Sequence, residues 1–342
     1  MSKRIFFATI IILALIPAHF FGQDERGQKT EGWAFSVEPV FGARLGQCKE
    51  ILWNKQSSGG YYKISELVYD IFPAWYFGVN AGMRYRRFGL NFYSKFFVPE
   101  KCGQLTDSDW QNDAKYGNGD TTTKTDYSEH TLLLQANAGG MAGFDLELQA
   151  DYKFYPTDFL TLSPLLSFNA QYISFHAKDG MGYYGKKDDR KRIIYPYDDV
   201  DHRNVEDFNG KPVINYDVYN LFLWSGVKAD FFPCDWAVIS LASEVALYSI
   251  MFDYDYHITN GKYFFDITNS ILFAFRQTIK AKLKVKKNLF ICQKTVFLFT
   301  GQSEGKSYAK LKKDDAYKKN VNSKAGGQMI CVDLELSLKF SW

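Results

Sequence analysis

Polar and apolar residues alternate with a period of two along much of this chain. At the carboxyl end one set of alternate positions is apolar and the other polar: Val332, Leu334, Leu336, Leu338, Phe340 and Trp342 against Asp333, Glu335, Ser337, Lys339 and Ser341. Residues 144–152 repeat the pattern, with acids at alternate positions. Because successive side chains of a strand point to opposite faces, this pattern predicts β-strands with one polar and one apolar face.

The same reading predicts about ten strands, near 32–47, 61–84, 88–98, 129–155, 160–184, 214–231, 237–257, 263–285, 289–303 and 327–342. Short turns are expected near Arg86-Arg87, Pro156–Asp158, Phe232–Asp235 and Lys286–Asn288, and long polar connections near 48–60, 99–128, 185–213 and 304–326. Short turns that alternate with long loops are typical of a transmembrane antiparallel β-barrel. Several strands exceed the roughly 9–11 residues that cross a bilayer, so the barrel should extend above the membrane. Pro73, inside the second strand, is expected at a bulge or kink.

The first 22 residues have the features of a secretory signal peptide. A short basic head at Lys3 and Arg4 precedes the apolar run Ile5–Phe21, and a small residue, Gly22, follows it. We therefore expect a signal peptide at 1–22 and a barrel at 23–342. Its removal takes away two positive charges, so the formal charge falls from +3 to about +1. A nearly neutral chain argues against a nucleic-acid partner.

Aromatic residues make up 18% of the chain, with 23 Tyr and 30 Phe. Aromatic girdles at two membrane interfaces would explain this excess. After the leader, no apolar segment approaches the roughly 18 residues that a spanning helix needs. We therefore expect a protein of the bacterial outer membrane.

The five cysteines, at 48, 102, 234, 292 and 331, form no close CxxC pair, and no histidine has the spacing of a zinc ligand. The order of the chain allows a Cys48–Cys102 bridge. We expect no metal and no cofactor.

Titratable residues converge at one rim of the predicted barrel. In Met251–His257, Asp253, Asp255 and His257 share one face of a strand, and three aromatic residues share the other. With both ends of the chain on the periplasmic side, this strand runs outward and delivers the three groups to the extracellular rim. Asp107 and Asp109, two residues apart, follow another outward strand and reach the same rim.

These blocks resemble the omptin family of outer-membrane endoproteases. The chain has Asp107-Ser108-Asp109-Trp110, Asp126–His130, Tyr172–Ala177 with Gly180, Asp253–His257 and Leu338–Trp342, in the family's order. The resemblance covers most of the mature chain and implies an aspartyl-type (Asp/His) endopeptidase that acts on polypeptides.

The resemblance also implies a role for each catalytic candidate. Asp107 and His257 would flank a water that attacks the scissile carbonyl, Asp255 would orient His257, and Asp109 would lie beside Asp107. Asp253 and Glu50 would form an acidic pocket that prefers basic residues, with Arg favoured over Lys because a guanidinium binds carboxylates as a fork.

Two other groups of residues complete the comparison with the family. Ser128 and His130 match the family's rim, but no Gly-x-Ser-x-Gly elbow supports a serine nucleophile, and His130 and His176 lack metal partners at ligand spacing. Family members bind lipopolysaccharide through an outward Tyr-x-Glu-x-Arg, whereas this chain has the uncharged Phe168, Ala170 and Tyr172. A dependence on lipopolysaccharide is therefore not carried over, although an outer-membrane lipid remains an expected partner.

The sequence leaves two functions to compare. The first is a surface endopeptidase that cleaves at basic residues, and the second is an inactive barrel that serves as an adhesin or receptor. The complete set of Asp107, Asp109, Asp255 and His257 favours the enzyme. A passive pore is disfavoured because ten strands enclose too little space for an open channel. We expect a monomer.

Overall fold

The computed structural model describes residues 32–55, 59–110, 127–135, 143–189, 193–195, 199–259, 261–270, 273–311, 313 and 315–342. The predicted signal peptide at 1–22 lies outside these residues. Within them every regular element is a β-strand. The same residues contain no helix long and apolar enough to cross a membrane.

The strands are β1 (Trp33–Lys55), β2 (Tyr61–Tyr85), β3 (Phe88–Phe97), β4 (Gln104–Trp110), β5 (Tyr127–Gln135), β6 (Gly143–Tyr152), β7 (Phe154–Thr157), β8 (Leu160–Tyr184), β9 (Lys186–Lys187), β10 (Ile193–Tyr195), β11 (Asn204–Asp207), β12 (Pro212–Cys234), β13 (Ala237–His257), β14 (Lys262–Ser270), β15 (Ala274–Lys286), β16 (Leu289–Thr300), β17 (Gly305–Lys310) and β18 (Lys318–Ser341).

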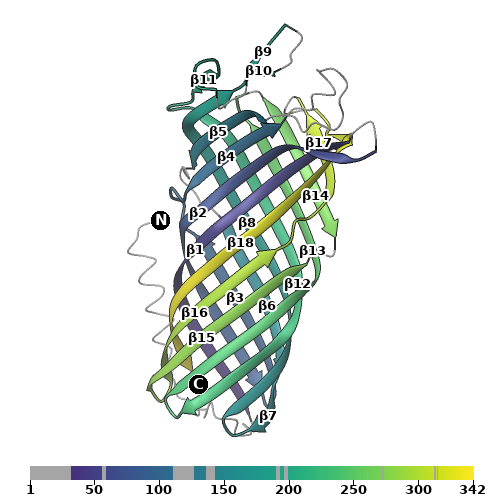
Figure 1. The fold of residues 1–342 in the computed structure, drawn as a ribbon. Helices are drawn as coiled ribbons and strands as arrows, with labels where there is room; N and C mark the ends of the chain where they lie inside the picture. The colour runs from purple at the N-terminus through teal and green to yellow at the C-terminus, as the bar shows by residue number, and fades with distance from the viewer. Residues whose placement is uncertain are drawn as a thin grey trace.

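These strands form a closed antiparallel barrel of tilted strands (Figure 1). β1 pairs with β2 on one side and with the last strand, β18, on the other, so the sheet has no free edge. At four places around the ring, two short strands follow one another along the wall where a single long strand would otherwise stand. They are β3 with β4, β5 with β6, β15 with β14, and β16 with β17. The described residues thus give about ten positions around the ring, which confirms the predicted fold.

The two ends of the barrel differ. At the turn end the chain reverses tightly at 86–87, 158–159, 235–236 and 287–288, as predicted. The last residue lies at the same end, where Phe35 and Trp342 exchange two backbone hydrogen bonds of 2.8 and 3.0 Å. The opposite, loop end carries β9, β10 and β11 (Figure 1).

The boundaries of three long connections were predicted wrongly. β1 continues to Lys55 instead of ending at 47. Residues 104–110 and 305–310, expected in loops, are the strands β4 and β17, and β18 begins at Lys318. These segments are polar, but most of their residues pair with neighbouring strands of the wall. Such pairing satisfies their backbone groups, which strand propensity does not reveal.

The wall separates apolar and polar side chains as the alternation predicts. On β18, Leu334, Leu336 and Leu338 are exposed outward, whereas Asp333 and Glu335 are buried inside the barrel. Large exposed apolar residues continue around the outer surface as one band. Its margins carry aromatic residues, among them Trp33, Tyr85 and Trp236 near the turn end and Phe41, Trp75 and Phe273 toward the loop end. Outward aromatic margins of this kind match the interfacial girdles of membrane barrels.

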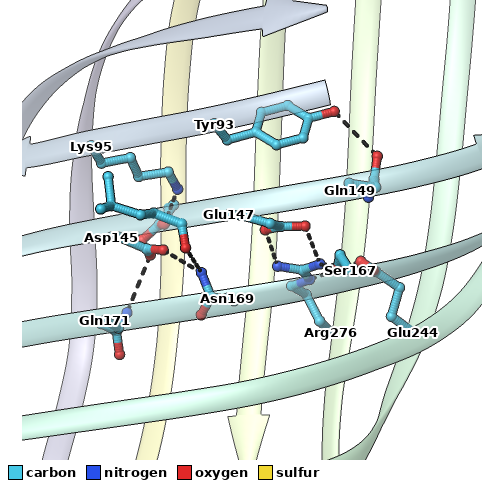
Figure 2. Close-up of polar contacts among 12 residues, drawn as sticks. Tyr93, Lys95, Asp145, Glu147, Gln149, Ser167, Asn169, Gln171, Glu244 and Arg276 are labelled. Carbon is cyan, nitrogen blue, oxygen red and sulfur yellow. Dashed lines mark hydrogen bonds and ion pairs between the residues drawn. The ribbon is translucent and has the colours of Figure 1, made fainter. Parts of the chain in front are cut away.

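Charges inside the barrel, at the level of this band, are paired. Arg276 lies between Glu147 and Glu244, at 2.5 and 2.7 Å, and Asn169 donates to Asp145 at 2.6 Å (Figure 2). Lys95 pairs with Asp333 at 2.6 Å. An unpaired charge in such a lumen would be costly, and these contacts neutralise the charges that line it.

β-Bulges change which residues face inward on the way to the loop end. On β2 the register shifts beside Pro73, as predicted: Tyr76 is buried on the turn side of it, and Tyr69 and Ile71 are buried on the loop side. On β13 the register shifts at Leu247, so the inward set changes from even to odd numbers. Without this extra residue, Asp253 and His257 would point outward.

Candidate active site

An Asp–His pair lies on the inner face of β13 near the loop end. The Nε2 of His257 is 2.6 Å from Oδ2 of Asp255. Asp255 is 2% exposed, whereas the His257 side chain keeps 20% of its surface accessible. The edge of the His257 ring packs against Phe264 of β14, with ring centroids 5.3 Å apart. The contact with Asp255 restricts the imidazole, and its remaining exposed surface faces the lumen.

Asp107 and Asp109 lie on β4, on the other side of the lumen. In the order of the strands around the barrel, β12, β8 and β5 separate β13 from β4. Asp107 is paired in register with Leu67, which is buried inside the barrel, so Asp107 also belongs to the inward face. The charges of Asp107 and Asp109 both act on His257. The structure therefore brings together the four residues predicted as catalytic.

The protonation of His257 follows from these neighbours. Burial alone would lower its pKa. The charge and hydrogen bond of Asp255, helped by Asp107 and Asp109, outweigh burial and raise the pKa of His257 to about 9. At neutral pH the resting His257 is therefore an imidazolium.

Deeper in the barrel lie Glu50 of β1 and Asp253 of β13, the two residues predicted to line an acidic pocket, and their carboxylates are within 4.8 Å of each other. Glu50 is 6% exposed and Asp253 fully buried. The Tyr216 hydroxyl donates to Oδ2 of Asp253 at 3.3 Å, while Oδ1 of Asp253 and Oε2 of Glu50 have no hydrogen-bond partner in the described part of the chain. Burial, together with neighbouring acids, raises the pKa of both carboxyl groups well above the usual range.

A third acid, Asp266 of β14, completes this cluster and was not among the residues predicted from the sequence. Asp266 is paired in register directly with Asp253 and is 1% exposed. Burial, followed by the charge of Asp255, raises its pKa to about 7. The sequence does carry a signal, since Lys262, Phe264, Asp266 and Thr268 alternate with Tyr263, Phe265 and Ile267. Only the pairing of β14 with β13 shows that this acid meets the pocket.

The remaining predicted residues lie away from the pocket or beyond what is described. Ser128 and His130 belong to β5, but their side chains and residue Asp126 are outside the described part. His176 contacts Asn215 at 2.8 Å and Ser174 at 3.2 Å, as a structural histidine would. All five cysteines, including Cys48 and Cys102, are free, so the bridge that the chain order allowed is absent.

The outward patch that replaces the family's lipid motif is aromatic. Tyr172 donates to Asp217 at 3.0 Å and stacks on Tyr219, with centroids 4.6 Å apart. Phe168 is 51% exposed. These residues form no basic site for a phosphorylated lipid on this part of β8.

The acidic cluster lies on the loop side of the outward apolar band. On β1 the band's margin at Phe41 is nine residues before Glu50, and on β13 the exposed Leu247 precedes Asp253 by six. At about 3.3 Å per residue these separations place the cluster well beyond the band along tilted strands. The cluster therefore lies nearer the loop end than the turn end of the barrel.

No family model and no curated protein matches the sequence. Among solved structures, the chain is similar to the outer membrane protease OmpT from Escherichia coli, with a TM-score of 0.76 and 12% identity, over 94% of this chain and all of that one. Ail of Yersinia pestis (TM-score 0.23, 10% identity, 89% of this chain and 99% of that one) and OprG of Pseudomonas aeruginosa (0.29, 6%, 92% and 98%) also match. At 12% identity the likeness to OmpT shows the fold, an outer-membrane type of β-barrel, and the chemistry must be argued from the residues.

Proposed function

We propose that this protein is an endopeptidase of the omptin type in the bacterial outer membrane, with its active site facing the cell exterior. The observation that carries the proposal is that side chains from two strands on opposite sides of the lumen act on one histidine. β13 supplies the Asp255–His257 pair at 2.6 Å, and β4 supplies two acids whose charges reach that histidine. Beneath them lies a cluster of buried carboxylates, which we assign to the binding of a basic side chain.

The chemistry that we assign needs no covalent intermediate. A water held between Asp107 and His257 attacks the scissile carbonyl, and neutral His257 accepts its proton. Asp255 then stabilises the imidazolium, and the proton passes to the leaving amine. Because the resting pair holds that proton up to about pH 9, the reactive neutral form is a minor species at pH 7, and its population rises with pH.

Selectivity would come from the buried carboxylates. A basic side chain that enters the pocket pairs with Glu50 and Asp253, whereas a neutral one leaves these acids without a partner. An unsatisfied buried charged group costs a few kcal/mol, which suffices for about 10²-fold discrimination.

The placement of the site supports the proposed location. Its residues lie beyond the apolar band on the side of the loop end, so a barrel whose turns face the periplasm would present them outside the cell.

The deciding experiment incubates the refolded full-length barrel with a quenched peptide that contains Arg-Arg. His257→Ala should remove cleavage, with the 10²–10⁴-fold loss typical of a missing general base. His176→Ala is the matched control, because this histidine of the loop half contacts Asn215 and Ser174 instead of the acids. Normal cleavage by folded His257→Ala would exclude the mechanism. No cleavage by the wild type would favour an adhesin or receptor.

A further inference from the structure

Three buried carboxylates in this barrel lack a basic partner. Among the described residues, ten acids are buried. Seven have a Lys, Arg or His within 4.0 Å: Glu38, Asp151, Asp230, Glu244, Asp255, Asp333 and Glu335. The three without such a partner are Glu50, Asp253 and Asp266, and they lie together. Buried charges are normally paired or coordinate metals, so a cation is a natural partner for this cluster.

The geometry of the cluster suits a single ion. One oxygen from each of the three carboxylates lies within 4.8 Å of the other two. Ca²⁺ binds oxygens at 2.3–2.6 Å, so two ligands on opposite sides of the ion are separated by about 5 Å. The carboxylates come from β1, β13 and β14, and the direct pairing of Asp253 with Asp266 holds two of them side by side. Like charges opposite each other in a sheet are destabilising, and a shared ion would remove that repulsion.

Unused oxygens point to the same conclusion. Oε2 of Glu50 and Oδ1 of Asp253 are buried without a hydrogen-bond partner among the described residues. The carboxylate of Asp266 lies near the Ser307 hydroxyl and the Tyr308 N–H, which act to lower its pKa, but neither contact has the distance and angles of a full hydrogen bond. The hydroxyl of Tyr69 is also buried without a hydrogen-bond partner among the described residues. Tyr69 is fully buried and stacks on Tyr216, the residue that donates to Asp253, with centroids 4.7 Å apart. A neutral oxygen of this kind is a ligand that hard cations accept beside carboxylates.

We propose that Glu50, Asp253 and Asp266 bind one divalent cation of the calcium class. The sequence has no cysteine or histidine spacing of a zinc site, and on that ground no metal was expected. The donors here are all oxygen, which favours Ca²⁺, Mg²⁺ or Mn²⁺ over softer metals. The spacing of the ligand oxygens, and the number of oxygens in the cluster that accept no hydrogen bond, favour Ca²⁺, which takes six to eight ligands in flexible geometry.

Metal binding would not require proteolytic activity, although both would use Glu50 and Asp253. The ion would occupy the carboxylates that we assign to a basic side chain, so metal and substrate would exclude each other. In an active enzyme, Ca²⁺ would then raise KM for a basic peptide and leave kcat unchanged. Binding itself is measured without any substrate, and in the His257→Ala background, so its outcome does not depend on catalysis.

The test titrates Ca²⁺ into the refolded full chain after treatment with EDTA, by calorimetry. Tb³⁺ luminescence provides a local readout, because Tyr216 lies 3.3 Å from Asp253 and can sensitise a bound lanthanide. We expect one ion per chain and at least tenfold weaker binding by Asp266→Asn, since even residues that only support metal ligands change affinity by 10–100-fold. Asp217→Asn removes the same charge from the outer face of β12 and should bind as the wild type does.

Each outcome decides the proposal. Asp266→Asn removes an unpaired buried charge, so it should fold; heat-dependent migration in SDS gels checks this, and Asp253→Asn is the second variant. Equal binding by the wild type and both variants would overturn the site, as would binding without fixed stoichiometry. If Ca²⁺ does not bind but acetyl-lysine amide or acetyl-arginine amide does, the cluster is a side-chain pocket and not a metal site.

Discussion

Replacement of Asp255 by Asn tests the proposed catalysis most directly. Asp255 touches His257 at 2.6 Å, and its charge is the strongest influence that raises the pKa of this histidine to about 9. In Asp255→Asn this influence is lost while burial remains, so the pKa should fall to the ordinary value of 6.5 or below. A fall of that size corresponds to about 3.4 kcal/mol, at 1.36 kcal/mol for each tenfold change.

The assay is the pH dependence of peptide cleavage, followed from about pH 5 to 10. If neutral His257 is the base, the wild-type kcat/KM should rise about tenfold per pH unit and level off near pH 9. The profile of Asp255→Asn should level off below pH 7. Its plateau should be lower by about 10²–10⁴-fold, since the imidazolium that forms during attack is no longer stabilised. NMR titration of labelled histidines would report the same pKa change without substrate.

Asp217→Asn is the control, because it removes a carboxylate from the outer face of the neighbouring strand at a similar height. It should leave the profile unchanged. A wild-type rate that does not vary between pH 6 and 9 would refute the assignment of His257 as base and transfer that role to Asp107. An unchanged inflection in folded Asp255→Asn would refute the electrostatic argument itself.

Three further predictions concern other parts of the site and the barrel. Asp253→Ala should weaken the preference for basic residues by about 10²-fold without abolishing hydrolysis; in a cleavage-site library, equal cutting after Leu and Arg by the wild type would contradict the pocket. Asp266→Asn should stabilise the metal-free barrel at pH 8 by a few kcal/mol and have little effect at pH 4. The reason is that folding raises the pKa of this carboxyl from 3.8 to about 7, so its contribution to stability is full below pH 3.8 and is lost as the pH rises through 7. The midpoint of heat-dependent gel migration at each pH measures this, and a lower midpoint for the variant at pH 8 would contradict it. Protease added to intact cells should cut the segment at 185–213, at the loop end, and spare the 235–236 turn, whereas the reverse pattern would invert the proposed orientation.

Much of the architecture could be predicted from the sequence because it follows from a local rule. Alternation with period two is imposed wherever one face of a strand meets an apolar surface and the other a polar lumen. Residues 332–342 and 144–152 therefore showed their strand, their inward acids and the class of the fold. The tight turns were equally local, and Pro73 marked its own bulge because proline cannot donate to the ladder.

Which residues meet, and on which face, was decided only by the tertiary structure. The extra residue at Leu247 changes the inward set of β13, and nothing in its own sequence marks it, because a bulge is defined by the count on the partner strand. The direct pairing of Asp253 with Asp266 depends on a register between two strands. The position of Asp107 opposite His257 depends on closure of β1 against β18, which bends the sheet into a ring. Strand register and barrel closure are long-range properties. A clear local pattern therefore shows where the acids lie along the chain, but not that three of them meet in one cluster.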